Sequence, residues 1–396
     1  MSDFLQSKEL DFYVSASICY GIVQTGESQE EGVPAIEVKD IVDGKINEET
    51  IKKTTVAIDS EYKRSRLKTG DIVIAIRGTI GRVAIVPSSL NGTNITRDVA
   101  RIRVDDPDKR DYIYFYLTSK VAEDHLRDNN IGQDAKGINI KDLKKLPIFI
   151  PEDKNEIKKL NSIFKTASKQ IEKQKHLIEA KEIQKKGLMQ KLLTGKTRFK
   201  GFADKWRTVK LDEILYEPNK DKVEKPNEYE LLTVKLHCQG VVRSGKFPNV
   251  TEKGRPYYLV ESGELLIGKQ NFHNGGFGIV PKGIKNVVTS NAITHLKEKS
   301  DLCVLKFVEY YFSQYNFYKK IDYLTGGTGQ KEISKKEFNS IKISLPSLQE
   351  QAKIVEVLLV ADKEIKLLNK KLFEIEEEKK GLMQKLFTGE VRVKVW

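Results

Sequence analysis

Apolar residues follow two different spacings along this chain. In the stretches 1–150 and 207–345, short apolar runs alternate with polar, glycine-containing segments, which is typical of strands joined by turns. From Pro151 and again from Pro346, apolar residues recur about every 3.5 positions, which predicts long amphipathic helices. The pattern therefore predicts a mixed α/β fold with two globular parts, each followed by a helix.

The helices are expected at 151–196 and 346–390, with a linker at 197–206 and a tail at 391–396. Proline suits the start of a helix, and acidic residues such as Glu152 and Asp153 suit its positive end. Helices of this length would measure roughly 60 Å. The heptad positions expected to form an apolar seam are Leu160, Phe164, Ala167, Ile171, Ile178, Leu188, Ile354, Leu358, Ala361, Ile365, Leu368, Leu372, Ile375 and Leu382.

The chain contains an internal repeat. KKGLMQKLLTG at 185–195 matches KKGLMQKLFTG at 379–389 in ten of eleven positions, at a separation of 194. Upstream segments correspond at nearly the same separation, for example TGDIVIAIRG at 69–78 with SGELLIGKQN at 262–271. The helices match closely and the globular parts only in outline, which is expected of two readers of different targets. Neutral drift of structural domains is the alternative.

Two helices that each carry half a seam should pair with one another. A pseudo-two-fold relation between the halves makes the pair an antiparallel coiled coil. We expect Lys185 to lie against Ala361 and Lys379 against Ala167, because a long charged side chain in the seam needs a small neighbour. The same register places the acidic residues 376–378 beside Lys169.

The composition favours an anionic partner. Lysine and arginine number 69 against 56 acidic residues, which gives a net charge of +13. The first helical segment is the more basic and is expected to face DNA or an acidic partner, unless it is simply a solvated face. Three scattered cysteines, no signal pattern and no long apolar run suggest a soluble protein of the cytoplasm.

Catalytic motifs are missing from the sequence. There is no phosphate-binding GxxxxGK[ST] loop, no GxSxG elbow and no HExxH. His237-Cys238 could be half of a metal site, but no second pair accompanies it, so packing in a core is the simpler interpretation. The glycine-rich loop 326–331 could contact phosphate or merely connect elements. The chain is expected to bind rather than to react, without a metal or cofactor of its own.

The duplicated KKGLMQKLxTG, the LP…EQ…I opening of the second helix at 345–354, and the GD(I/L) strand before a polar loop resemble a type I restriction-modification specificity subunit. The resemblance covers nearly the whole chain. The first copy departs from it because Asn155-Glu156 stands where the second has Glu350-Gln351. It also has no counterpart of Trp206.

The resemblance implies two target recognition domains, at 1–150 and 207–345, that each read half of a split, asymmetric DNA site. It implies that the helix pair sets the spacer and docks two modification subunits, which methylate adenine at N6 after flipping it from the stack. Restriction subunits would add translocation and cleavage. S-adenosylmethionine, ATP and Mg²⁺ would belong to those partners.

Base readout favours arginine, lysine, asparagine and glutamine beside polar turns, although such residues can equally contact phosphates or solvent. The candidate DNA-binding residues are Arg77, Arg82, Asn94, Arg97, Lys136, Lys269, Gln270, Asn271, His273, Asn291 and Lys331. Two other functions remain open from the sequence. One is a non-enzymatic regulator with two DNA-binding domains on a coiled-coil spacer, and the other is a nuclease with an unrecognised site.

Overall fold

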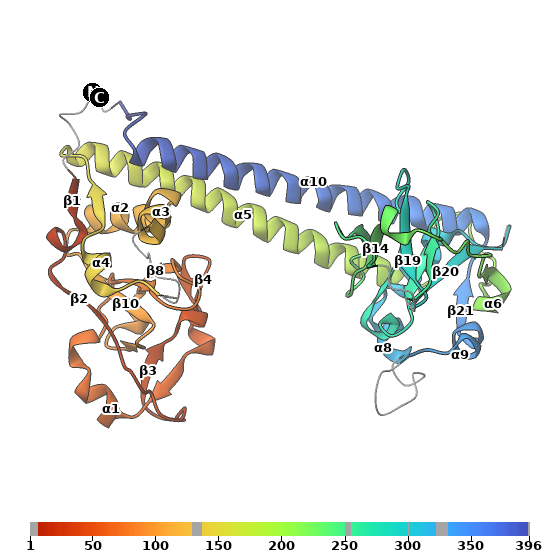
Figure 1. Cartoon of the computed structure of the whole chain (residues 1–396), viewed down its shortest axis with the longest axis horizontal. Coiled ribbons are helices and arrows are strands. Elements are labelled where there is room, and N and C mark those ends of the chain that lie inside the picture. The colour runs from red at the N-terminus through yellow and green to blue at the C-terminus, as the bar shows by residue number, and fades with distance from the viewer. Residues whose placement is uncertain (1–6, 129–136, 250–254, 300, 322–331, 395–396) are drawn as a thin grey trace. The chain divides into compact units, whose positions relative to one another are not determined.

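The computed structural model describes residues 7–128, 137–249, 255–299, 301–321 and 332–394 (Figure 1). Contacts divide the chain into two compact units. The first comprises Met1–His176 together with Lys370–Trp396, and the second comprises Leu177–Asn369. The long helices are therefore shared between the units, so each globular part is completed by helix segments from both copies of the repeat.

The first unit is built around an antiparallel four-stranded sheet in the order β2-β10-β7-β8. Its strands are β2 (Ala16–Tyr20), β10 (Val99–Arg103), β7 (Ile72–Ala75) and β8 (Val83–Ile85). The apolar residues of the repeated segment at 69–78 form β7, which is buried throughout. The smaller sheets comprise β6 (Lys52–Thr54), β3 (Val33–Ile36) and β9 (Asn94–Ile95), then β1 (Ser7–Glu9) with β11 (Pro147–Phe149), and β4 (Ile41–Val42) with β5 (Lys45–Ile46).

The second unit repeats this plan with a sheet in the order β13-β20-β17-β18. Its strands are β13 (Leu215–Tyr216), β20 (Ile293–Glu298), β17 (Leu265–Gly268) and β18 (Phe277–Ile279). Each unit also has one parallel strand pair, β3 with β9 and β14 with β19. The remaining strands are β14 (Glu230–Val234), β15 (Val241–Arg243), β16 (Tyr257–Leu259), β19 (Val287–Ser290), and β12 (Arg207–Lys210) with β21 (Lys342–Leu345).

Short helices cover the sheets. Two aromatic-rich stretches, at 112–126 and 304–321, are largely helical, and a turn interrupts each of them. In the first, the Ser119 hydroxyl accepts from the backbone N–H of Ala122 and starts a new helix. The short helices are α1 (Val56–Glu61), α2 (Pro107–Leu117), α3 (Lys120–Asp128), α4 (Ile140–Lys144), α6 (Leu211–Ile214), α7 (Leu305–Phe312), α8 (Tyr315–Lys320) and α9 (Lys335–Ser340).

The two long helices are α5 (Lys154–Leu192) and α10 (Leu348–Phe387). The Asp153 carboxylate accepts from the backbone N–H of Asn155 at 2.8 Å and caps the start of α5. Gly195 and Gly389 follow the helices with φ of 70° and 72°, a left-handed conformation that ends a helix and that glycine adopts without strain. The repeated Thr-Gly of the sequence motif therefore marks the two helix ends.

The helices run antiparallel in each unit, because contact positions rise along α5 as they fall along α10. Leu160, Phe164, Ile178, Ile354, Leu358 and Ile375 of the expected seam are buried. Half-buried seam positions are Ala167, Ile171, Leu188, Ala361, Ile365, Leu368 and Leu372. The prediction for Leu382 is wrong: it is 37% exposed, and its neighbour Met383 packs in the core instead. The heptad frame shifts by one residue there.

The helix register agrees with the predicted one to within a residue. Lys185 forms an ion pair with Asp362, which adjoins the expected Ala361. Lys379 Nζ donates to Ser168 Oγ at 2.9 Å, beside the expected Ala167. The acidic run makes an ion pair one turn further along α5, where Glu376 lies 3.8 Å from Lys175, and its placement beside Lys169 stays a prediction.

Equivalent ion pairs lock the start of each helix. In the second unit, Arg198 donates to both Glu350 oxygens, at 2.9 and 2.7 Å. In the first, Arg392 pairs with Glu156 in the same way. Glu156 is therefore the counterpart of Glu350. The sequence motif that looked altered in the first copy keeps its carboxylate at the position that pairs with arginine.

Each hydrophobic core is closed by the helix end of the other repeat. Phe387 of α10 packs in the first core, with ring centroids 5.0 to 5.3 Å from Phe164, Tyr112 and Tyr116. Leu192 and Leu193, at the end of α5, are buried in the second core. Neither globular part buries its apolar surface with its own copy alone.

Candidate nucleic-acid interface

In both units, the polar loop that follows the central strand lies against the turn that precedes the neighbouring strand. The backbone N–H of Ile76, after β7, donates to the carbonyl of Asp98 at 2.9 Å, just before β10. The backbone N–H of Lys269, after β17, donates to the carbonyl of Ala292 at 3.1 Å, just before β20. These are equivalent positions of the repeat, so the same two-loop platform is built twice.

The platform of the first unit carries three of the predicted arginines. Arg77 and Arg97 are exposed and lie 3.8 and 3.6 Å from the Asp98 carboxylate, which holds both guanidinium groups at one place. Arg82 donates to the carbonyl of Ile41 at 3.2 Å and thereby ties the β7–β8 loop to β4. This unit thus presents a cationic, arginine-rich loop face.

Asn94 does not belong to that face, and its prediction as a DNA contact is wrong. It is 0% exposed in β9. Its amide donates to Asp59 Oδ1 at 2.8 Å, and its carbonyl accepts from the Ser65 hydroxyl at 2.7 Å. Asn94 therefore organises the interior beneath the loops. Lys136 and Lys331 lie outside the described residues.

The platform of the second unit has different chemistry. Asn271 and Asn291 are exposed on its two loops, whereas Lys269, Gln270 and His273 are half-buried. The Nε2 atom of His273 is 3.0 Å from the Asn274 amide, while its Nδ1 is buried and has no hydrogen-bond partner among the described residues. Amides here replace the arginines of the first unit, so the two faces would contact different base edges.

A turn at His237-Cys238 supports the second platform, a role that sequence reasoning missed. Both residues have positive φ, 57° and 58°, which is strained for side chains of this kind. Their backbone N–H groups donate to the carbonyls of Asn274 and Gly275 at 2.8 and 2.9 Å. Burial raises the pKa of the Cys238 thiol to about 11, so it stays protonated. The sequence signal for this turn is the His-Cys pair itself. From the sequence pattern, such a pair suggests metal binding or packing in a core, and not a supporting turn.

Beneath the second platform lies a buried polar cluster. His295 on β20 places Nδ1 3.2 Å from a Glu264 oxygen and Nε2 2.6 Å from the Thr289 hydroxyl. Burial alone would raise the pKa of Glu264. Hydrogen bonds from His295 and from the Glu261 N–H lower it, as do the nearby charges of His295 and Lys297, and together they hold that pKa below its usual range. The carboxylate thus stays ionised beneath the loops.

Two further properties bear on the chemistry of this surface. Among the described residues, no three histidine, cysteine, aspartate or glutamate side chains come together as a group that could hold a metal ion. Within the same part of the chain, no helix has both the length and the apolar character needed to cross a membrane.

Comparison with known proteins gives a consistent assignment. The family model for the type I restriction modification DNA specificity domain matches twice, at residues 22–182 and 203–377. The EcoBI specificity subunit of a type I restriction enzyme from Escherichia coli is 35% identical over 164 residues, which are 40% of this chain and 34% of that subunit. The MjaVIII specificity subunit from Methanocaldococcus jannaschii is 28% identical, over 72% of this chain and 71% of that protein.

The fold is also found among solved structures. A chain solved in a study of complex assembly and conformational transition of the type I restriction-modification system has a TM-score of 0.61. The match covers 99% of both chains at 15% identity, so it supports the fold alone. Two matches of one family model, placed on the two halves of an internal repeat, account for most of the sequence. The chain therefore belongs to the family of type I restriction-modification DNA specificity proteins, which are non-catalytic DNA-recognition subunits.

Proposed function

We propose that the two units read the two halves of one split, asymmetric DNA sequence, each through its own loop platform. The observation that carries this proposal is the repetition of one backbone arrangement with different side chains: arginines at 77 and 97 in the first unit, asparagines at 271 and 291 in the second. Arginine favours guanine and asparagine favours adenine in the major groove. Two platforms with the same backbone arrangement and different side chains are suited to reading two unrelated half-sites.

The α5–α10 pair would fix the distance between half-sites and hold the modification subunits. Support for docking comes from apolar side chains that point away from the seam into solvent, an unusual feature for a water-exposed helix. In the second unit these exposed side chains are Leu177, Ile183, Leu359, Val360 and Leu367. In the first unit, Phe373 is exposed on α10.

In this proposal the chain acts in the cytoplasm, where it recognises the DNA sequence and sets the spacing of the half-sites, and its partners carry out the reactions. Two modification subunits would carry S-adenosylmethionine and methylate adenine at N6, and restriction subunits would use ATP and Mg²⁺. The globular parts at 1–150 and 207–345 would be the recognition domains. Membership of the specificity family favours this function over the alternative of a free-standing regulator.

The test is single-molecule methylome sequencing of a host that carries this chain with its candidate modification subunit. A host lacking the chain is the comparison. We expect a bipartite motif containing N6-methyladenine only when the chain is present. Arg97→Ala should relax the bases of one half of the motif, and Asn291→Ala those of the other half. Absence of methylation despite co-purification, or relaxation of both halves by either variant, would contradict the proposal.

Docking has a separate test. Val360→Asp places a charge on the exposed helix face and should abolish co-purification of the modification subunit, because a charge cannot be buried there without a partner. Lys366→Asp, at an exposed polar position of the same helix, is the matched control and should retain the complex. Equal behaviour of the two variants would show that the subunit docks elsewhere.

A further inference from the structure

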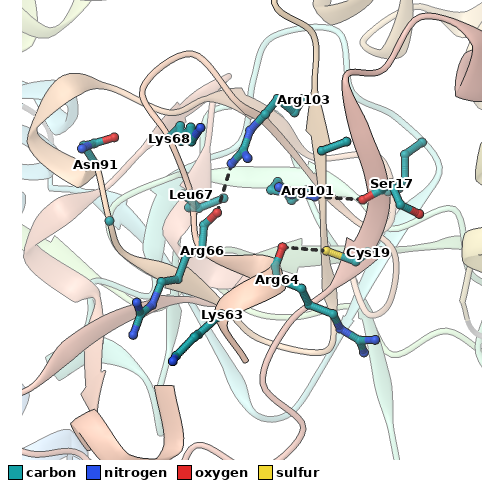
Figure 2. A pocket seen from close by; sticks show the side chains of 13 residues that line it. Ser17, Cys19, Lys63, Arg64, Arg66, Leu67, Lys68, Asn91, Arg101 and Arg103 are labelled. Carbon is teal, nitrogen blue, oxygen red and sulfur yellow. Dashed lines mark hydrogen bonds between the residues drawn. The ribbon is translucent and has the colours of Figure 1, made fainter. Parts of the chain in front are cut away.

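The first unit contains a cationic cleft away from the loop platform. It has a volume of about 870 Å³ and opens between β2, the 3-10 turn Lys63–Ser65, the turn at 91–92 and β10 (Figure 2). Its basic lining residues are Lys63, Arg64, Arg66, Lys68, Arg101 and Arg103. None of them was among the residues predicted to contact DNA.

Among the residues that the structure describes, carboxylates pair with two of these six cations. Arg103 pairs with Asp71 at 2.7 Å, and Arg66 pairs with the buried Asp59. Within the described ranges, Lys63, Arg64, Lys68 and Arg101 have no carboxylate at ion-pair distance. The cleft therefore holds an excess of positive charge that no acidic group of the described chain balances.

Arg101 is the least expected of these cations because it is only 4% exposed. One guanidinium nitrogen, Nη2, donates to the Ser17 carbonyl at 2.8 Å. Its Nε is buried and has no hydrogen-bond partner in the part of the chain that the structure describes. Burying a charged group with an unused donor is costly, so such groups commonly indicate a ligand that completes them.

The second unit has a different buried residue, with different partners, at the position equivalent to Arg101. Arg101 on β10 pairs with Val73, and His295 on β20 pairs with Leu266, so the two residues occupy equivalent register positions. His295 has both ring nitrogens engaged, by Glu264 and Thr289. In the first unit the counterpart of Glu264 is Asp71, which is taken by Arg103. Among the described residues at this register position, the buried cation that is incompletely bonded is therefore Arg101 of the first unit.

We propose that this cleft binds a phosphate of the DNA backbone, with Arg101 at its floor and Lys63, Arg64 and Lys68 at its rim. A phosphate offers several charged oxygens to guanidinium and ammonium donors and would satisfy the free Nε. The inference rests on the proposed DNA-reading function. Arg97 and Arg101 are four residues apart, about 13 Å along an extended strand, so one duplex could contact both sites.

The experiment measures binding of the full chain to fluorescent 30-bp duplexes of unrelated sequence, by anisotropy over a series of salt concentrations. The test variant, Lys63→Gln/Arg64→Gln/Lys68→Gln, changes only exposed side chains and should leave the fold intact. We expect weaker binding to every duplex. The slope of log K against log salt should fall by about 0.9 for each phosphate that the variant no longer neutralises.

The matched control, Lys366→Gln/Lys371→Gln/Lys385→Gln, removes equal charge from exposed positions of α10 and should leave the slope unchanged. Arg101→Gln tests the floor, and Arg101→Lys should restore part of the slope because it keeps the charge. An unchanged slope in the rim variant, or an equal decrease in the control, overturns the cleft as a phosphate site while the proposed function stands. Failure of the unaltered chain to bind any duplex would overturn both.

Discussion

Asn94 connects three segments of the first unit through one buried amide. We expect Asn94→Ala to lower the free energy of unfolding of that unit by about 2 kcal/mol, because Asp59 and Ser65 would each lose a buried partner. Urea unfolding measures the loss, and methylome sequencing should show an unaltered motif. Arg97→Ala is the control with the opposite outcome, normal stability and altered recognition. A changed motif without destabilisation would mean that Asn94 reaches DNA.

Glu264 makes the stability of the second unit depend on acid pH. Its pKa is held low in the folded state, so the carboxylate contributes stability above its unfolded pKa of about 4.3 and loses it as pH falls through the folded value. We expect the stability advantage of the unaltered chain over Glu264→Gln to shrink between about pH 5 and pH 3. Urea midpoints at several pH values measure this, and a constant difference would contradict it.

Polar turns beside apolar strands were a usable signal at the residue scale. Arg77, Arg97, Asn271 and Asn291 lie on the platforms because each stands directly after or before a strand that the repeat defines. The same signal failed for Asn94, because β9 is two residues long and its side chain turns inward. Arg101 lies among apolar residues inside a strand. The sequence does not show that its guanidinium is buried, nor which of its donors has no partner.

Lys185 and Lys379 are equivalent in the repeat yet have different surroundings. Lys185 pairs with Asp362, whereas burial lowers the pKa of Lys379, whose ammonium donates to the Ser168 hydroxyl. We expect Lys379→Met to stabilise the first unit by about 1 kcal/mol, because it removes a desolvated charge. Lys185→Met should destabilise the second unit by about 1 kcal/mol, because Asp362 loses its cation.

Thermal unfolding of the two methionine variants, compared at each of several pH values, separates these effects. The gain from Lys379→Met should grow as pH falls from the ordinary lysine pKa to the lower folded pKa, because the unfolded state then binds a proton that the buried lysine does not. Shifts of the same sign in both variants would contradict the difference in surroundings.

Phe387 fastens the end of α10 to the first core. Its replacement by alanine should cost about 3 to 5 kcal/mol, because three aromatic neighbours would line the resulting cavity. Phe373→Ala on the same helix is the control and should change stability by about 0.5 kcal/mol or less, since Phe373 is 63% exposed. Denaturant unfolding followed in the first unit measures both.

At the element scale, periodicity predicted the long helices and their register to within one residue. It failed where packing changes the frame, at Leu382 and Met383, because a continuous heptad cannot reveal that the helix end enters a globular core. Polar pairs, Thr118-Ser119 and Ser313-Gln314, divide the aromatic helices. The Ser119 hydroxyl caps the helix after the first break, whereas Gln314 at the second makes no side-chain cap.

At the scale of the molecule, each core is completed by the other repeat. A fragment of residues 1–196 would leave the first core uncovered and the side chains of Leu192 and Leu193 without their core. We expect this fragment to form a homodimer in which each copy supplies its helix end to the other. Leu193→Phe should tighten the dimer, because phenylalanine stands at the equivalent position 387. Sedimentation equilibrium measures the association, and a stable monomer would contradict the exchange.

Because the end of α10 completes the first core, that core cannot finish folding until the second half of the chain has been synthesised. Most residues of the first core belong to the first 176 positions and are synthesised early. Met383, Leu386 and Phe387, which complete the same core, are synthesised about 200 residues later. At about 5 to 20 residues per second, the nascent first unit spends about 10 to 40 s with the site of Phe387 unfilled. Its earliest translated half is therefore among the last to finish folding, and chaperones have their longest opportunity to bind there.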